Sequence, residues 1–318
     1  MRRYILGRIA VLPLSMLVVS FVTFAFLHLV PGDAVDALGG DNLSRDDLEQ
    51  LRRQYGLDHS FLVQFGYWLA NAVRGDLGAS IRTHQPVLKE VLERLGPTVE
   101  LALLAVIMSL ILGVASGAIA VYWRDSFVDR LIMGLSTLGM SIPVYFAATL
   151  LVLGISLYFP EVGVVSYAPL SRGLLANVQS LFVPALALAI VAASTFVRYV
   201  RGAAEDILRN ADFVRTARAK GASRSRILLR HIMPNTLIPL ATAAGLQLAY
   251  LIGGTVVIES IFALPGLGQL LLAAIGQRDY PIVQGCVLFQ AMTFVVVNLG
   301  VDLLYPMLDP RVRLATTR

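Results

Sequence analysis

Residues able to do chemistry are few and scattered in this sequence. The two lysines, Lys89 and Lys220, lie outside any Gly-x-x-x-x-Gly-Lys-Ser/Thr phosphate-binding motif, and a single cysteine, Cys286, excludes an internal disulfide. An intramembrane enzyme would need convergent histidines and carboxylates, which the sequence lacks. No metal-ligand spacing connects the four histidines, His28, His59, His84 and His231. We therefore expect no metal, no cofactor and no catalytic residue in this chain.

The strongest local pattern lies in a basic segment between two apolar stretches. A short helix is compatible with Asp212 in its first turn and Lys220 in its last turn. Gly221 suits the left-handed residue that follows a helix, and Ser223 can cap a second helix that runs to Pro234. A partner helix could approach this segment closely because several of its side chains are small, namely Ala217, Ala219 and Ala222.

A second group of candidates lies in apolar stretches and suggests a transport pathway. Pro143, beside Ser141, should kink a membrane helix, either to line the pathway or only to bend it. A charge in a membrane helix marks function or needs a partner, so Glu259 either faces an outer vestibule or caps the turn at Gly266 and Gly268. The apolar stretch from Gly266 is too short to span a bilayer, and it predicts a re-entrant or interfacial segment that forms an outer gate.

The composition places most of the chain in a membrane. Hydrophobic residues make up 57% and charged residues 15% of the 318 residues, whereas a soluble domain carries about 25% charged residues. Backbone groups in lipid must bond within their own segment, so we expect helices of about 20 residues each. The predicted class is an all-α integral membrane protein with about six transmembrane helices, near residues 9–30, 99–123, 131–159, 181–200, 236–261 and 282–308.

The distribution of arginine predicts the orientation in the membrane. Basic residues cluster before the first span, between the fourth and fifth spans, and after the sixth. The positive-inside rule places all three clusters, and so both termini, in the cytoplasm. The net charge of +5 therefore needs no nucleic-acid partner to explain it. The first span is longer than the apolar core of a signal peptide, so we expect it to be retained.

The polar segment 31–97 predicts a small extracytoplasmic helical insertion between the first two spans. One helix should run from Ser44 to Gly56, and a later one should open at Pro86 and end at Gly96 and Pro97. A helix between these two should place on one face Leu62, Phe65, Leu69 and Val73. We therefore divide the chain into an N-terminus with the first span (1–30), the insertion (31–97), and a transmembrane domain (98–318) whose cytoplasmic loop spans about 201–235.

The basic segment resembles the loop through which permeases of ABC importers contact their ATPases. That loop has the pattern Glu-Ala-Ala, three residues, Gly, nine residues, Ile-x-Leu-Pro. The matching positions are Ala217, Gly221, Met233 and Pro234, and the departures are Arg215 at the glutamate, Thr216 at the first alanine and His231 at the isoleucine. The run 215–221 is similar to the form found in the dipeptide, oligopeptide and nickel subfamily. Further stretches similar to that subfamily are 55–58, 75–80, 97–102, 141–143, 259–268, 278–285 and 308–311.

The resemblance implies a type I importer permease in a bacterial inner membrane. It assigns ATPase docking to Arg215, Thr216, Ala217, Lys220, Gly221, Met233 and Pro234. It also implies the partners, which are a second, similar permease, two cytoplasmic ATPases that bind ATP and Mg²⁺, and an extracytoplasmic solute-binding protein. Short peptides are the first expectation for the substrate, with glutathione or nickel chelates as alternatives within the family. A self-sufficient secondary transporter is the alternative outside it.

Overall fold

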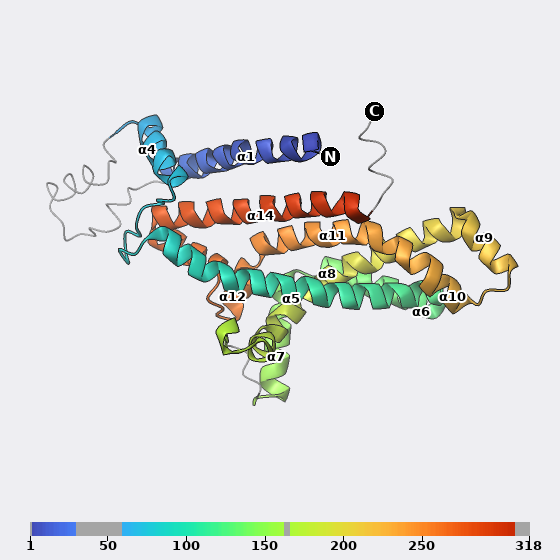
Figure 1. The fold of residues 1–318 in the computed structure, drawn as a ribbon. Helices are drawn as coiled ribbons and strands as arrows, with labels where there is room; N and C mark the ends of the chain where they lie inside the picture. Colours follow the sequence, from blue (N-terminus) through green and yellow to red (C-terminus); the bar gives the residue numbers. More distant parts are fainter. Residues whose placement is uncertain (1, 30–58, 162–165, 309–318) are drawn as a thin grey trace. The chain divides into compact units, whose positions relative to one another are not determined.

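The computed structural model describes residues 2–29, 59–161 and 166–308, and Figure 1 shows its elements. Within these ranges the only pairing of extended backbone is a bridge between Ala79 and Pro86, so the all-α class is confirmed. Two of the helical elements are not α-helical, the 3₁₀ turn η2 and the π-helical turn η3. In chain order the elements are α1 (Arg2–Leu29), α4 (Phe61–Val73), α5 (Val87–Tyr122), α6 (Phe127–Ser141), α7 (Val144–Tyr158), η2 (Leu170–Arg172), α8 (Leu174–Asn210), α9 (Asp212–Ala219), α10 (Arg224–Ile227), η3 (Leu228–Ile232), α11 (Met233–Gly254), α12 (Val256–Ile261), α13 (Leu267–Gln277) and α14 (Tyr280–Leu308).

The described helices account for the expected membrane spans. Four are long and apolar enough to cross a bilayer, namely α5, α8, the Leu12–Leu29 part of α1 and the Tyr280–Val301 part of α14. Two pairs of consecutive helices, each bent at a short break, pass the same test when each pair is taken together. These pairs are α6 with α7, and Arg224–Leu237 with Pro239–Gly254. Counting each pair as one span gives up to six in the described part of the chain. The prediction of about six is therefore confirmed.

The third predicted span is two helices rather than one kinked helix. The axes of α6 and α7 differ in direction by 103°. The cause is Pro143, which lacks an N–H and disfavours helical backbone in the residue before it. Ile142 accordingly has φ −81° and ψ 123°, and Pro143 has φ −60° and ψ 136° and caps α7. The expected kink is thus a complete break.

The chain divides into two compact units, which we describe separately. Unit 1 takes its described residues from Val99–Leu264 and from Val296 onward. Unit 2 takes them from Arg2–Thr98 and Pro265–Val295. The described part of the predicted insertion, residues 59–97, therefore belongs, together with α1, α13 and the start of α14, to unit 2. The predicted helix from Ser44 to Gly56 lies outside the described residues.

In unit 1, α8 is the central helix, and it packs against α6, α7 and α11. Figure 1 shows α5, α8 and α11 running alongside one another. Small residues permit the close approach of α5 to α8, as is usual where membrane helices pack. A Cβ added to Gly113 would lie 2.5 Å from the Cβ of Phe196, and one added to Gly117 would lie 2.7 Å from the Cβ of Val200. These two glycines thus set the distance between the helices.

In unit 2, the first turns of α5 pack against α13 and the start of α14. Val87 and Val91 are fully buried there, so packing holds the helix in place before it reaches Pro97. The predicted helix end at Gly96 and Pro97 is wrong, because α5 continues through both residues. Proline removes one intrahelical hydrogen bond, and a membrane helix tolerates that loss when packing compensates.

The predicted helix near Leu62–Val73 is confirmed as α4, and Phe65 is the buried residue of its predicted apolar face. Leu62 and Val73 are 68% and 81% exposed, whereas Phe65 is buried. The Phe65 ring makes edge contacts with the rings of Phe21 and Phe24 of α1, at centroid distances of 5.3 and 5.5 Å. Aromatic pairing with α1 therefore decides which side of α4 is buried, and apolar spacing alone does not contain that information.

Candidate functional site

The basic segment of unit 1 forms a short helix with a defined end. α9 begins at Asp212 and carries Arg218 in its last turn, as the helix dipole favours. Gly221 follows with φ +77°, the left-handed conformation expected from the sequence. Its N–H donates to the Arg218 carbonyl at 2.9 Å, and the Ala222 N–H donates to the Ala217 carbonyl at 3.0 Å. These two bonds make a Schellman motif, so the predicted helix end is confirmed.

Ser223 caps the next helix, also as predicted. Its Oγ accepts a hydrogen bond from the Arg226 N–H at 3.4 Å. The helix does not stop at Pro234, however, because α10 continues through the π-helical turn η3 into α11. Pro234 lies in the first turn of α11, a position where proline is tolerated. The segment is therefore helix, glycine bend and one long irregular helix.

The predicted docking residues lie on two different faces of this segment. Ala217 and Met233 are buried in an apolar cluster of unit 1 that also contains Phe196 and Val200. The five others are exposed, namely Arg215, Thr216, Lys220, Gly221 and Pro234. Ala217 and Met233 thus serve internal packing, and only the exposed group can contact a partner.

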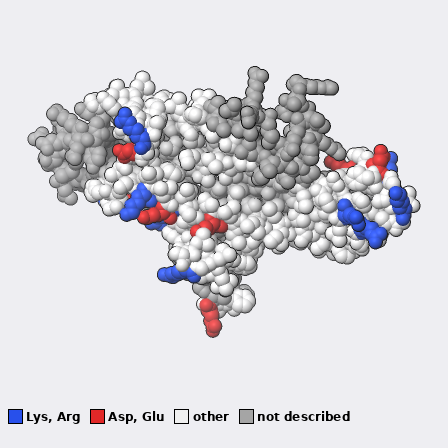
Figure 2. Space-filling model, in the orientation of Figure 1, with Lys and Arg blue, Asp and Glu red and all other residues white. Residues whose placement is uncertain are grey.

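The exposed face is strongly basic and carries an apolar side chain. Figure 2 shows Lys and Arg side chains gathered over the α9–α10 end of unit 1. The Phe213 side chain is 45% exposed among them. Arg215 and Asp212 form an exposed ion pair at 3.7 Å, which contributes little to stability at such a position. An accessible aromatic group among cations is typical of a protein interface.

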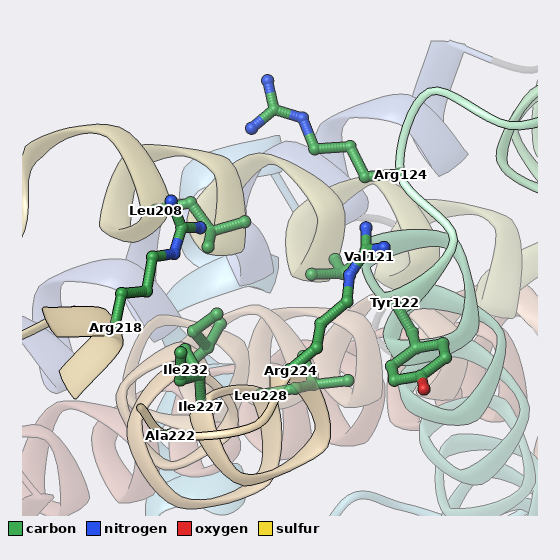
Figure 3. A pocket seen from close by; sticks show the side chains of 10 residues that line it. All are labelled: Val121, Tyr122, Arg124, Leu208, Arg218, Ala222, Arg224, Ile227, Leu228 and Ile232. Carbon is green, nitrogen blue, oxygen red and sulfur yellow. The ribbon is translucent and has the colours of Figure 1, made fainter. Parts of the chain in front are cut away.

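A cavity of about 300 Å³ opens beside this segment, between α5, α8 and the α9–α10 turn. Figure 3 shows side chains reaching toward it from each of these elements. Its apolar lining comes from Val121, Leu208, Ala222, Ile227, Leu228 and Ile232, and its polar lining from Tyr122, Arg124, Arg218 and Arg224. Among the described residues, those that line the cavity include three arginines and no carboxylate, so its electrostatic potential favours an anion.

Sequence reasoning missed an ion-pair network that joins α6 to α8. Arg201, with 12% of its side chain exposed, contacts both Asp129 and Glu205. Glu205 also contacts Arg124 and Arg209. The i, i+4 spacing of Arg201, Glu205 and Arg209 was visible in the sequence and is typical of paired charges on a helix. The partners from α6 and the end of α5 were not predictable from spacing.

The pathway candidates of unit 1 have different surroundings. Ser141 and Pro143 are exposed at the α6–α7 break, and the Ser141 hydroxyl donates to the Thr137 carbonyl at 3.0 Å. The Glu259 side chain is fully buried and accepts a hydrogen bond from the Thr255 hydroxyl at 2.8 Å. Burial of the carboxylate argues against an open vestibule around it, and the predicted cap on the turn at Gly266 and Gly268 stays a prediction.

The remaining pathway candidates belong to unit 2. Gly266 precedes α13 and Gly268 is buried in its first turn. The Leu267 N–H donates to the Thr98 hydroxyl at 2.8 Å, which fixes the start of α13 on α5. The short apolar stretch forms the helix α13, and its predicted re-entrant or interfacial position is not tested by this packing. Its role as a gate stays a prediction.

A second polar cluster of unit 1 was not predicted. The Tyr167 hydroxyl and the Asn177 amide both donate to Glu100, at 2.9 and 2.7 Å. Asn177 also donates to the Ala168 carbonyl at 2.8 Å, which ties the loop before η2 to α8. Burial and the neighbouring Glu100 carboxylate raise the pKa of Tyr167, so its hydroxyl stays a proton donor at neutral pH.

Among the described residues, no group of three or more His, Cys, Asp or Glu side chains could hold a metal ion. The described helices are those of a membrane protein, and comparisons with known proteins identify its family. A family described as "Binding-protein-dependent transport system inner membrane component" matches residues 103–314. The corresponding N-terminal family matches residues 1–102.

Related proteins cover almost the whole chain. A peptide transport system permease protein of Brucella abortus is 41% identical over 316 residues, which are 98% of this chain and 99% of that protein. The glutathione transport system permease protein GsiC of Escherichia coli is 35% identical over 316 residues with the same coverage. The chain belongs to the family of binding-protein-dependent transport system inner membrane components, the permease subunits of ABC importers.

The fold agrees with this family. A structure of the MetNI methionine ABC transporter, solved in inward-facing conformations, matches with a TM-score of 0.56 at 16% sequence identity. The match covers 69% of this chain and 96% of that chain. At this identity the likeness concerns the fold alone, and it confirms the predicted type of helical permease.

Proposed function

We propose that this permease forms half of the translocation pathway of an importer for short peptides, glutathione among them. The names of two relatives that each cover 98% of the chain, a peptide and a glutathione permease, support this substrate class. Purification of the tagged chain from mild detergent tests the assembly. We expect two ATPases, a second permease and a solute-binding protein to co-purify. A stable chain that transports without ATPases would contradict the proposal and favour a secondary transporter.

The substrate is best measured on the solute-binding protein that co-purifies. Di- and tripeptides, glutathione and nickel chelates should be compared by their effect on its melting temperature. A ligand that binds only the native state raises this temperature according to its concentration and affinity. We expect peptides or glutathione to stabilise the protein. Stabilisation by nickel chelates alone would contradict the proposed substrate class.

The proposed orientation places α9, α10 and both termini in the cytoplasm. It rests on the arginines of the loop between the fourth and fifth spans, under the positive-inside rule. Two single-cysteine variants, Lys220→Cys and Arg82→Cys, test the orientation in a Cys286→Ala background. Both positions are exposed. A membrane-impermeant maleimide added to intact cells should label the second position and spare the first. The reverse pattern would overturn the orientation.

We infer that the exposed face of α9 is the docking site for an ATPase subunit. The observation that carries this inference is the two-sided structure of α9. Val214 and Ala217 anchor one side in unit 1, and Phe213, Arg215 and Thr216 project from the other. A short helix fixed on one side and capped by a Schellman motif transmits a displacement as a rigid body. ATP binding to the partner would then shift this permease between two conformations.

Two substitutions of Gly221 test this coupling. A Cβ at this residue would meet no described atom within 4 Å beyond its two neighbouring residues, so the constraint comes from φ +77°. Gly221→Val forces a β-branched residue into this conformation, whereas Gly221→Asn tolerates it. We expect both variants to insert into the membrane. The importer that contains the valine variant should hydrolyse ATP through its ATPase subunits without transport, and the importer that contains the asparagine variant should keep transport. Normal transport by the valine variant would show that the Gly221 turn has no role in coupling.

A further inference from the structure

The cavity of unit 1 has the composition of an anion site with an apolar floor. Arg218 comes from the end of α9 and Arg224 from the start of α10, so the Schellman turn between them brings two guanidinium groups to one cavity. Figure 3 shows their side chains reaching toward the cavity from different sides, with Ile227 and Leu228 below. Guanidinium groups bind phosphate through paired N–H donors.

The charges of Arg218 and Arg224 are uncompensated within the described part of the chain. Neither forms an ion pair with a described carboxylate, whereas Arg124 pairs with Glu205 at 3.2 Å and with Asp125 at 3.3 Å. The guanidinium carbon of Arg224 lies 5.5 Å from the centroid of the Tyr122 ring, which orients it over an aromatic face. Two cations beside an apolar floor, one of them oriented by an aromatic ring, are suited to a ligand with a phosphate and a hydrocarbon part.

The cavity also lies at the end of a membrane span. Val121 and Tyr122 are the last residues of α5 that line it, and α5 passes the test for a membrane-crossing helix. The next residue, Trp123, is 47% exposed. Tyrosine and tryptophan concentrate at the level of the lipid headgroups. Basic pockets between membrane helices at this level are suited to acidic lipid headgroups.

From these observations we propose that the cavity lined by Arg124, Arg218 and Arg224 binds a phosphate group, supplied by an acidic phospholipid or by a free phosphate-bearing solute. The apolar lining and the position at a span end favour the lipid. The proposal rests on the membrane location of the chain and does not depend on which substrate is transported. Lipid bound at this point would contact both α9 and α5, and so would influence how the basic segment is held.

Native mass spectrometry of the purified full-length chain tests the proposal. The probes are phosphatidylglycerol, phosphatidylcholine and inorganic phosphate. The pocket variant combines Arg218→Gln with Arg224→Gln. The matched control combines Arg226→Gln with Arg230→Gln, which removes two exposed arginines of the same segment that do not line the cavity. Each arginine near the membrane surface contributes roughly 1 kcal/mol to the binding of an anionic lipid, which is about fivefold in affinity.

We expect phosphatidylglycerol to bind the wild type and the control alike, and to bind the pocket variant about 25-fold more weakly. Phosphatidylcholine should bind all three weakly. Displacement of the lipid by millimolar phosphate, or binding of phosphate alone, would identify a free solute as the source. Equal weakening in both double variants would overturn the proposal, because it would show a general charge effect.

A third variant keeps every arginine and fills the cavity. Ala222→Phe adds bulk to the wall and should lower phosphatidylglycerol binding without changing the charge. Melting temperatures of all variants show whether each is folded. The pocket variant could instead keep its lipid binding and lose the ATPase that co-purifies with the wild type. That result would show that the arginines bind an acidic side chain of the ATPase, and the lipid proposal would be wrong.

Discussion

Arg201 of α8 holds the carboxylate of Asp129 of α6 through two parallel hydrogen bonds, from Nε to Oδ1 at 3.1 Å and from Nη2 to Oδ2 at 3.0 Å. Only 12% and 7% of these side chains are exposed. The bidentate geometry is one that arginine makes and lysine does not. The pair therefore fixes the first helix of the broken α6–α7 span against the central helix of unit 1.

Breaking this pair should destabilise the permease more than removing both charges. Arg201→Gln leaves Asp129 buried without its partner, which costs about 3–5 kcal/mol. The double variant Arg201→Gln with Asp129→Asn should recover part of this loss, and Arg201→Lys should be intermediate. Unfolding in mixed detergent and dodecyl sulfate measures the free energies. Equal effects of the single and double variants would show that the pair is not coupled.

Close packing of α5 on α8 predicts that Gly113→Ala is destabilising. The new Cβ would lie 2.5 Å from the Cβ of Phe196 and 3.0 Å from the carbonyl oxygen of Ala193. Overpacking of this kind costs about 1–3 kcal/mol. The control is Gly134→Ala in α6, where a new Cβ would meet no described atom within 4 Å outside the adjoining backbone of its own helix. Helix propensity there favours alanine by up to about 1 kcal/mol. Similar melting temperatures for the two variants would contradict the packing argument.

In unit 2, Asp279 should hold the loop before α5 in place. The Ser80 hydroxyl donates to its Oδ2 and the Ile81 N–H donates to its Oδ1 at 3.3 Å, and both side chains are buried. Hydrogen bonds to charged groups contribute about 1.5–3 kcal/mol. Ser80→Ala should therefore speed trypsin cleavage at Arg82. Thr83→Ala, which removes an exposed bond to Glu90, should have little effect, and equal cleavage of the two variants would contradict this role.

The docking proposal predicts a specific role for the exposed ring of Phe213. Phe213→Ala should reduce the amount of ATPase that co-purifies with the tagged chain, by about tenfold if the ring is an interface anchor. Leu229→Ala removes another exposed apolar side chain of the same segment, 67% exposed, and serves as the control. Unchanged ATPase recovery with Phe213→Ala would place the interface elsewhere. The melting temperature of the chain alone should not change in either variant.

Features with a purely local cause were predictable from the sequence. The left-handed Gly221 and the capping Ser223 follow from backbone and side-chain chemistry within a few residues, and both are confirmed. Proline was less predictable because its effect depends on packing. At Pro143 the helix breaks, whereas at Pro97 the buried turns that begin at Val87 keep α5 continuous.

Features that depend on distant residues were not predictable. Asp129 and Arg201 are 72 residues apart, and only the fold brings them together. The docking residues show the same limit. The pattern that contains Ala217 and Met233 predicts a docking segment, but these two residues are buried, whereas Arg215 and Thr216 beside them are exposed. A linear motif does not state which of its positions face a neighbour and which face the interior.

The π-helical turn at Leu228–Ile232 has a consequence for the geometry of the cavity. Each of its hydrogen bonds closes over one residue more than in an α-helix, so the turn is equivalent to a single-residue insertion. Deleting one residue there would restore regular winding and rotate α10 by about 100° relative to α11. Arg224 would then turn away from Tyr122 without having been mutated. The direction in which Arg224 points therefore depends on the extra residue in the π-helical turn that follows it in the sequence.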